Sequence, residues 1–112
     1  SPLKFGVLSG LDKEKTGRRT GDLQQRTLAK HKDKLERFEV FCHARGEHPA
    51  DVALAWTLAN PAVTAPIVGP RTMDHLLGAQ RALEIQLDAA ALKALDEIFP
   101  GPGGPAPEAY AW

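Results

Sequence analysis

Residues 63–72 read Val-Thr-Ala-Pro-Ile-Val-Gly-Pro-Arg-Thr, and this stretch decides the fold class. Residues 63–68 are mostly apolar and rich in β-branched side chains, which predicts a short buried strand that closes at Gly69. Pro66 lacks an amide donor, so it indicates a sheet edge or a strand irregularity. Because a lone strand cannot satisfy its own backbone, this prediction requires a partner sheet from elsewhere.

Helical patterns surround the predicted strand. Residues from about 23 to 44 carry apolar side chains on one helical face, namely Leu28, Leu35, Phe38 and Cys42. Gly46 is a candidate C-cap, and a helix that is apolar nearly all round is expected to start at Pro49 and to be buried on several sides. Thr72 and Asp88 are candidate N-caps of two further helices. The predicted organisation is a loop over 1–22, helix–helix–strand–helix–helix over 23–99 and a tail over 100–112.

Composition narrows the class of protein. The 112 residues fit one domain, and Lys+Arg and Asp+Glu are equal at 14 each, so the charge balance disfavours nucleic acid and membrane surfaces as partners. No apolar run is long enough for a membrane helix, and the first residues do not resemble a secretory signal. The one cysteine, Cys42, is expected to be a small buried hydrophobe in a reducing compartment, which favours a cytoplasmic location.

The turn after the predicted strand is the strongest candidate for a binding site. A strand that ends in glycine and leads into a helix presents free amides and a positive helix dipole to an anion. Gly69 permits a phosphate to approach the backbone, Arg71 offers a planar fork that matches phosphate, and Thr72 can donate its hydroxyl or cap the helix. His75 lies one turn into the helix, where it can reach a ligand or remain a solvated surface histidine. An ordinary strand-to-helix turn with an exposed arginine is the alternative.

Other chemical signals are weaker. The opening residues, Ser1-Pro2-Leu3 with Gly6, form either a second anion-contacting loop or a plain flexible terminus. The four histidines lack a metal-ligand spacing, which predicts that no metal is bound. No acid–base or nucleophile constellation emerges, since helix caps and solvated helix faces account for the carboxylates.

Taken together and in order, these residues resemble the aldo-keto reductase family, specifically its bacterial branch related to potassium-channel β-subunits. The opening loop is similar to that family's SPLGGGLLTG segment, and residues 49–56 are similar to its PAQVALAW helix. Residues 60–72 resemble the eighth strand with its turn, and residues 92–112 resemble the closing helix and C-terminus. The resemblance covers the whole chain.

The resemblance implies an α/β fold in which this chain forms the C-terminal part of a (β/α)8 barrel. It also implies reduction of aldehydes or ketones by NADPH. The family's catalytic Asp, Tyr, Lys and His lie upstream of the SPL motif, so no catalytic residue is assigned here. What carries over is cofactor contact, with the loop after strand seven near the pyrophosphate and the eighth-strand turn at the adenosine end, Arg71 on the 2′-phosphate. The implied cofactor-binding residues are Ser1, Leu3, Gly6, Gly69, Arg71, Thr72 and His75.

The sequence departs from the family pattern at a few of these places. Lys4 and Phe5 stand where small residues are usual, and His75 and Ala79 replace a glutamine and an asparagine that contact adenine. Two functions remain open. One is the NADP-binding part of a carbonyl reductase completed by the missing N-terminal part of the barrel. The other is a noncatalytic barrel fragment that self-associates or binds nucleotide only. A generic helical interaction module would leave the Gly69–Thr72 turn unexplained.

Overall fold

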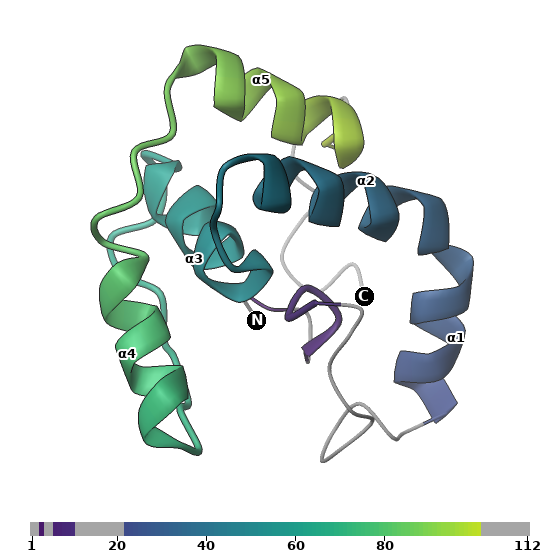
Figure 1. Cartoon of the computed structure of the whole chain (residues 1–112), viewed down its shortest axis with the longest axis horizontal. Coiled ribbons are helices and arrows are strands. Elements are labelled where there is room, and N and C mark those ends of the chain that lie inside the picture. Colours follow the sequence, from purple (N-terminus) through teal and green to yellow (C-terminus); the bar gives the residue numbers. More distant parts are fainter. Residues whose placement is uncertain (1–2, 4–5, 11–21, 102–112) are drawn as a thin grey trace.

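The computed structural model describes residues 3, 6–10 and 22–101, and it is helical throughout its regular parts (Figure 1). The helices are α1 (Asp22–Lys30), α2 (Lys32–Ala44), α3 (Pro49–Ala59), α4 (Met73–Arg81) and α5 (Ala89–Ile98). Ser1, Lys4, Phe5 and most of the predicted loop over 1–22 lie outside the described residues, as does the predicted tail from residue 102 onward.

The predicted strand over 63–68 is wrong for this structure. Residues 65–70 are irregular, and no strand occurs in the described part of the chain. The cause is physical, because a strand needs a neighbouring strand to pair its amides and carbonyls, and none of the other described segments supplies one. Ile67, which the pattern predicts to be buried, is 94% exposed.

The predicted helix over 23–44 is also divided in two. His31, with φ −113° and ψ 19°, separates α1 from α2 without a side-chain cap. The hydrogen bonds from His31 N to Thr27 O and from Leu35 N to His31 O continue on either side, so the chain bends without losing its backbone pairing. Residues 23–44 contain neither proline nor glycine, which explains why the bend was not predicted.

The predicted helix starts and stops are confirmed by the structure. Pro49 occupies the first turn of α3, where its missing amide costs no hydrogen bond. Thr72 caps α4 and Asp88 caps α5 through their side-chain oxygens. Gly46 follows α2 with φ +68°, a left-handed conformation that glycine adopts without strain.

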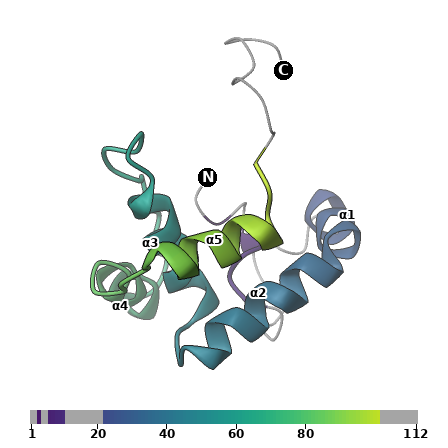
Figure 2. The ribbon, with the colours of Figure 1, turned by 90° about the horizontal axis from the view of Figure 1, so that it is seen from above.

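The core lies where α2, α3 and α5 meet (Figures 1 and 2). Its buried members are Phe38, Cys42, Val52, Ala53, Leu95 and Ile98. Phe99 closes the cluster, with its ring edge-on to Phe38 at 5.9 Å between centroids and tilted against half-buried Trp56 at 6.1 Å. As the sequence predicts, α3 is buried on several sides, because it packs against α2 on one side and α4 on another. Within the described ranges, no helix is both long enough and apolar enough to cross a membrane.

Candidate functional site

The turn before α4 is an open, capped helix N-terminus. Thr72 has extended backbone angles, and its Oγ1 accepts a hydrogen bond from the His75 amide at 3.2 Å. Gly69 is exposed, and a Cβ atom added there would meet nothing within 4 Å. Its φ is outside the left-handed region, so nothing within the described chain requires glycine at this position. Glycine is useful here only if something outside the described residues approaches the backbone closely.

The side chains of Arg71 and His75 flank this turn. Arg71 is exposed and forms no ion pair with any described residue. The Arg71 amide donates to Nδ1 of His75 at 3.4 Å, a long hydrogen bond that turns the imidazole back over the turn. The turn therefore brings Gly69, Arg71, Thr72 and His75 together, with the guanidinium left available and one nitrogen of the imidazole engaged.

The opening loop is held in place by its own backbone. Leu3 O accepts hydrogen bonds from the amides of Gly6 at 2.9 Å and Leu8 at 3.2 Å, and Ser9 Oγ donates to Gly6 O at 2.6 Å. Gly6 has φ +89°, a left-handed conformation that explains the glycine. Leu3 is half-buried and packs against the core cluster, so its side chain serves packing in this structure.

The two candidate parts of the site are not brought into contact here. In Figures 1 and 2 the opening loop, drawn in purple, and α4, drawn in green, lie on different sides of α3. Leu3 packs against the core cluster, whereas Gly69, Arg71, Thr72 and His75 are exposed. Ser1 lies outside the described residues, so its predicted role stays a prediction.

The sequence did not predict a half-buried ion pair between α3 and the C-terminal end of α4. Asp51 in α3 is only 5% exposed, and its Oδ2 accepts a hydrogen bond from Nε of Arg81, in α4, at 2.9 Å. Gly78 of α4 lies against the same carboxylate. Two signals pointed to it, an acidic residue in an otherwise apolar helix and a glycine within a helix.

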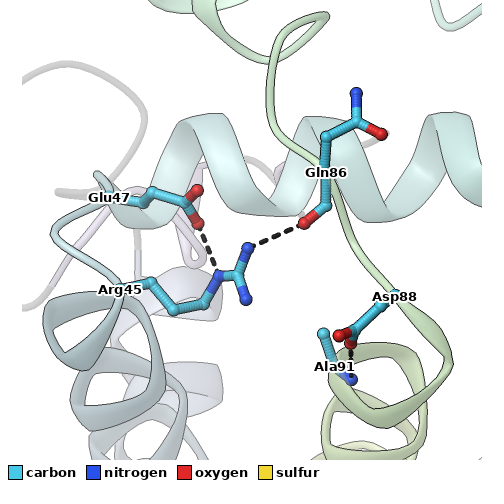
Figure 3. A network of polar contacts seen from close by, with 5 residues as sticks. All are labelled: Arg45, Glu47, Gln86, Asp88 and Ala91. Atoms are coloured by element: carbon cyan, nitrogen blue, oxygen red, sulfur yellow. Dashed lines mark hydrogen bonds and ion pairs between the residues drawn. The ribbon is translucent and has the colours of Figure 1, made fainter.

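A second polar network braces the core from outside (Figure 3). The Arg45 guanidinium donates to Glu47 Oε2 at 2.8 Å and to the carbonyl of Gln86 at 2.8 Å. The side-chain hydrogen bond to Glu47 raises the pKa of the Arg45 guanidinium above its ordinary value. Asp88 caps α5 beside this network by accepting from the Ala91 amide at 2.8 Å. These residues join the α2–α3 turn to the segment that enters α5.

Nucleophilic and metal chemistry find no support among the described residues. Burial, together with the charges of Glu47 and Glu39, raises the pKa of the Cys42 thiol to about 12. A thiol this hard to ionise is inert as a nucleophile near neutral pH. No group of three or more metal-binding side chains occurs in the described ranges.

Comparison with known proteins gives one matching family and several relatives. Residues 1–99 match the model of the aldo/keto reductase family. The chain is 50% identical over its whole length to the uncharacterized oxidoreductase YrpG of Bacillus subtilis, of which it covers 34%. It is 32% identical over 88% of its length to a putative voltage-gated potassium channel subunit beta of Schizosaccharomyces pombe, of which it covers 32%. Norsolorinic acid reductase B of Dothistroma septosporum is 33% identical over 59% of the chain, which covers 17% of that protein. The chain thus spans about a third of the length of the first two relatives.

Proposed function

The chain belongs to the aldo/keto reductase family, and from this premise we propose that it forms the NADPH-binding end of a carbonyl reductase. In the whole protein, the bound nicotinamide supplies a hydride to an aldehyde or ketone. The catalytic groups come from the segment upstream of the opening loop. We propose a cytoplasmic setting, because the one cysteine, Cys42, is a free buried thiol.

The open turn at the start of α4 is the observation that carries this proposal. An exposed glycine backbone, a guanidinium without an ion-pair partner among the described residues and a capped helix N-terminus converge there. Each of these features favours a phosphate, and the arginine fork can bind one bidentately. The residues therefore fit the 2′-phosphate that distinguishes NADPH from NADH.

The remaining residues of the turn have narrower roles. The Thr72 hydroxyl already accepts the His75 amide, so it holds the turn rather than an adenine ring. The imidazole of His75 has one nitrogen left to donate toward a ligand, since its Nδ1 accepts from the backbone. Ala79 offers no polar side chain, so we expect adenine recognition to rest on His75 and on apolar contact.

Replacing Arg71 tests the proposal directly. In the full-length protein that carries this sequence, Arg71→Ala should cost roughly 1–3 kcal/mol of NADPH binding free energy, the value of a charge-assisted hydrogen bond. NADH binding should change little, because it lacks the 2′-phosphate. Fluorescence titration of both cofactors measures the difference.

Arg37→Ala is the matched control, since Arg37 is also exposed but lies on α2. It should leave the affinity for both cofactors unchanged. Equal losses of NADPH and NADH affinity in Arg71→Ala would refute the assignment of this residue to the 2′-phosphate.

Self-association is a second candidate, and one observation favours it. Large apolar side chains stand exposed on and beside α4, namely Ile67, Val68, Met73, Leu76, Leu77 and Leu83. Large apolar side chains that stay exposed favour association when nothing covers them. Sedimentation of the full-length protein and of an Ile67→Lys variant tests it, and a concentration-independent monomer in both would exclude this function.

A further inference from the structure

The two halves of α4 differ in how they are held. Residues 71–77, which include the turn and the first part of α4, are all exposed. Gly78 and Ala82 are buried, and the helix packs on α3. Within the described residues, α4 is therefore attached to the molecule through its C-terminal half, while the end that carries Arg71 projects away.

The attachment combines an ion pair with a close approach of two helices. The Asp51 carboxylate accepts a hydrogen bond from Nε of Arg81 at 2.9 Å and lies directly over Gly78. A Cβ atom at Gly78 would stand 2.6 Å from Oδ1 of Asp51, closer than real side-chain carbons approach an oxygen. Glycine is unfavourable within a helix, so its presence here is explained by the room that the carboxylate needs.

We propose that Asp51, Arg81 and Gly78 form a positioning device that sets the direction of α4 and thereby the place of Arg71 in the cofactor site. This inference rests on the function proposed above. At a rise of about 1.5 Å per residue, the first residue of α4, Met73, stands roughly 7.5 Å along the helix from Gly78, and Arg71 lies two residues beyond it. A rotation of about 10° therefore moves Arg71 by roughly 2 Å. A displacement of that size breaks a hydrogen bond to phosphate.

A purely stabilising role accounts less well for the same residues. The Arg81 side chain is 51% exposed, so the pair is open to solvent on one side and gains little stability from its charges. The Asp51 side chain, by contrast, is only 7% exposed. It lies in the first turn of α3, where the helix dipole favours a negative charge. A rigidly held carboxylate with a directional partner is suited to fixing an angle between two helices, which apolar contact alone does poorly.

The experiment measures NADPH affinity in the full-length protein for Gly78→Ala, Arg81→Ala and the double variant Asp51→Ala with Gly78→Ala. Gly78→Ala should raise the Kd and the KM for NADPH at least fivefold, with kcat at saturating NADPH within twofold of the parent. Arg81→Ala should act in the same direction. In the double variant the new Cβ fills space that the carboxylate has left, so its Kd should be lower than that of Gly78→Ala.

Glu36→Ala is the control, because it breaks an ion pair that lies wholly within α2, that with Lys32 at 3.7 Å. It should leave the Kd for NADPH within twofold of the parent. Circular dichroism verifies that each variant keeps its helices, and Arg81→Lys, which retains the charge, should recover part of the lost affinity.

The Arg71→Ala background separates the two proposals. If Arg71→Ala weakens NADPH binding and the Gly78 and Arg81 variants do not, the positioning role is refuted and the cofactor site stands. If Arg71→Ala has no effect, the proposed function itself fails. If both hold, Gly78→Ala in the Arg71→Ala background should change the Kd less than twofold, because the contact that it displaces is already absent.

Discussion

The core at α2, α3 and α5 and the projecting α4 differ in what holds them. Phe38, Cys42, Val52 and Leu95 are at most 2% exposed, whereas Met73 and Leu77 of α4 are 68% and 46% exposed. Apolar burial thus holds the core, whereas an ion pair and the approach of Gly78 to Asp51 mark the contact of α4 with α3. The turn that is the candidate binding site thus lies beside a helix whose large apolar side chains are exposed, which is common for ligand-binding segments.

The largest expected effect is the loss of a core side chain. Phe38→Ala should lower the free energy of unfolding by about 3–5 kcal/mol, because it removes a 2% exposed ring and the edge-on contact with Phe99. Leu77→Ala in α4 should lower it by less than about 1 kcal/mol, since the side chain is already half in water. Urea unfolding followed by circular dichroism measures both. Similar losses of unfolding free energy in the two variants would contradict the difference between the two regions. They would show that another part of the protein covers Leu77.

A smaller effect concerns the pH dependence of core stability. The folded protein holds the pKa of Cys42 at about 12, against an ordinary value of 9.0. Below pH 9 the thiol is protonated in both states, but between pH 9 and pH 12 only the unfolded chain loses the proton, so stability falls as pH rises. Relative to Cys42→Ala, the parent should lose about 1.4 kcal/mol per pH unit in this window. If the free energy of unfolding changed with pH in the same way in both proteins, the pKa of Cys42 would not be raised by folding.

The smallest effect compares two helix caps of the same kind. Asp88→Ala, at the start of α5, should cost about 1 kcal/mol of global stability, since it removes the acceptor of the Ala91 amide. Thr72→Ala removes the matching acceptor at α4, but that helix can open without the core. Hydrogen exchange should therefore show faster exchange confined to α4 in Thr72→Ala and a faster rate across the core helices in Asp88→Ala. Faster exchange across all helices in Thr72→Ala would show instead that α4 and the core unfold together.

Sequence reasoning succeeded where the signal is local. Pro49, Thr72 and Asp88 were predicted to start helices, and they do, because first-turn prolines and capping side chains act within a few residues of their own position. Cys42 was predicted to be buried from its place on an apolar helical face, and it is fully buried. The residues of the turn from Gly69 to His75 lie together because they are neighbours in the chain, and their role in cofactor binding stays a prediction.

The predictions from the sequence failed where a feature depends on residues that are distant in the chain. The strand over 63–68 was predicted from its own composition, but a strand forms only against a partner that the described residues do not supply. The Asp51–Arg81 pair joins residues 30 positions apart, so local patterns can single out Asp51 and Gly78 but cannot pair Asp51 with Arg81. Whether Ser1, Leu3 and Gly6 meet the same cofactor as Arg71 stays a prediction, because it depends on how distant segments come together.

The hydrogen bond from Arg45 to Gln86 has a consequence for how this sequence can vary. It joins the chain just before α3 to the chain just before α5, at positions 41 residues apart, so the segment that holds α3 and α4 leaves and returns at one place (Figure 3). A segment whose two ends are fixed side by side can be exchanged for another of different length or chemistry without refolding its surroundings. Grafting residues 46–85 as one unit, which keeps Asp51 together with Arg81 and Gly78, is therefore a practical route to change cofactor preference while α2 and α5 stay the same.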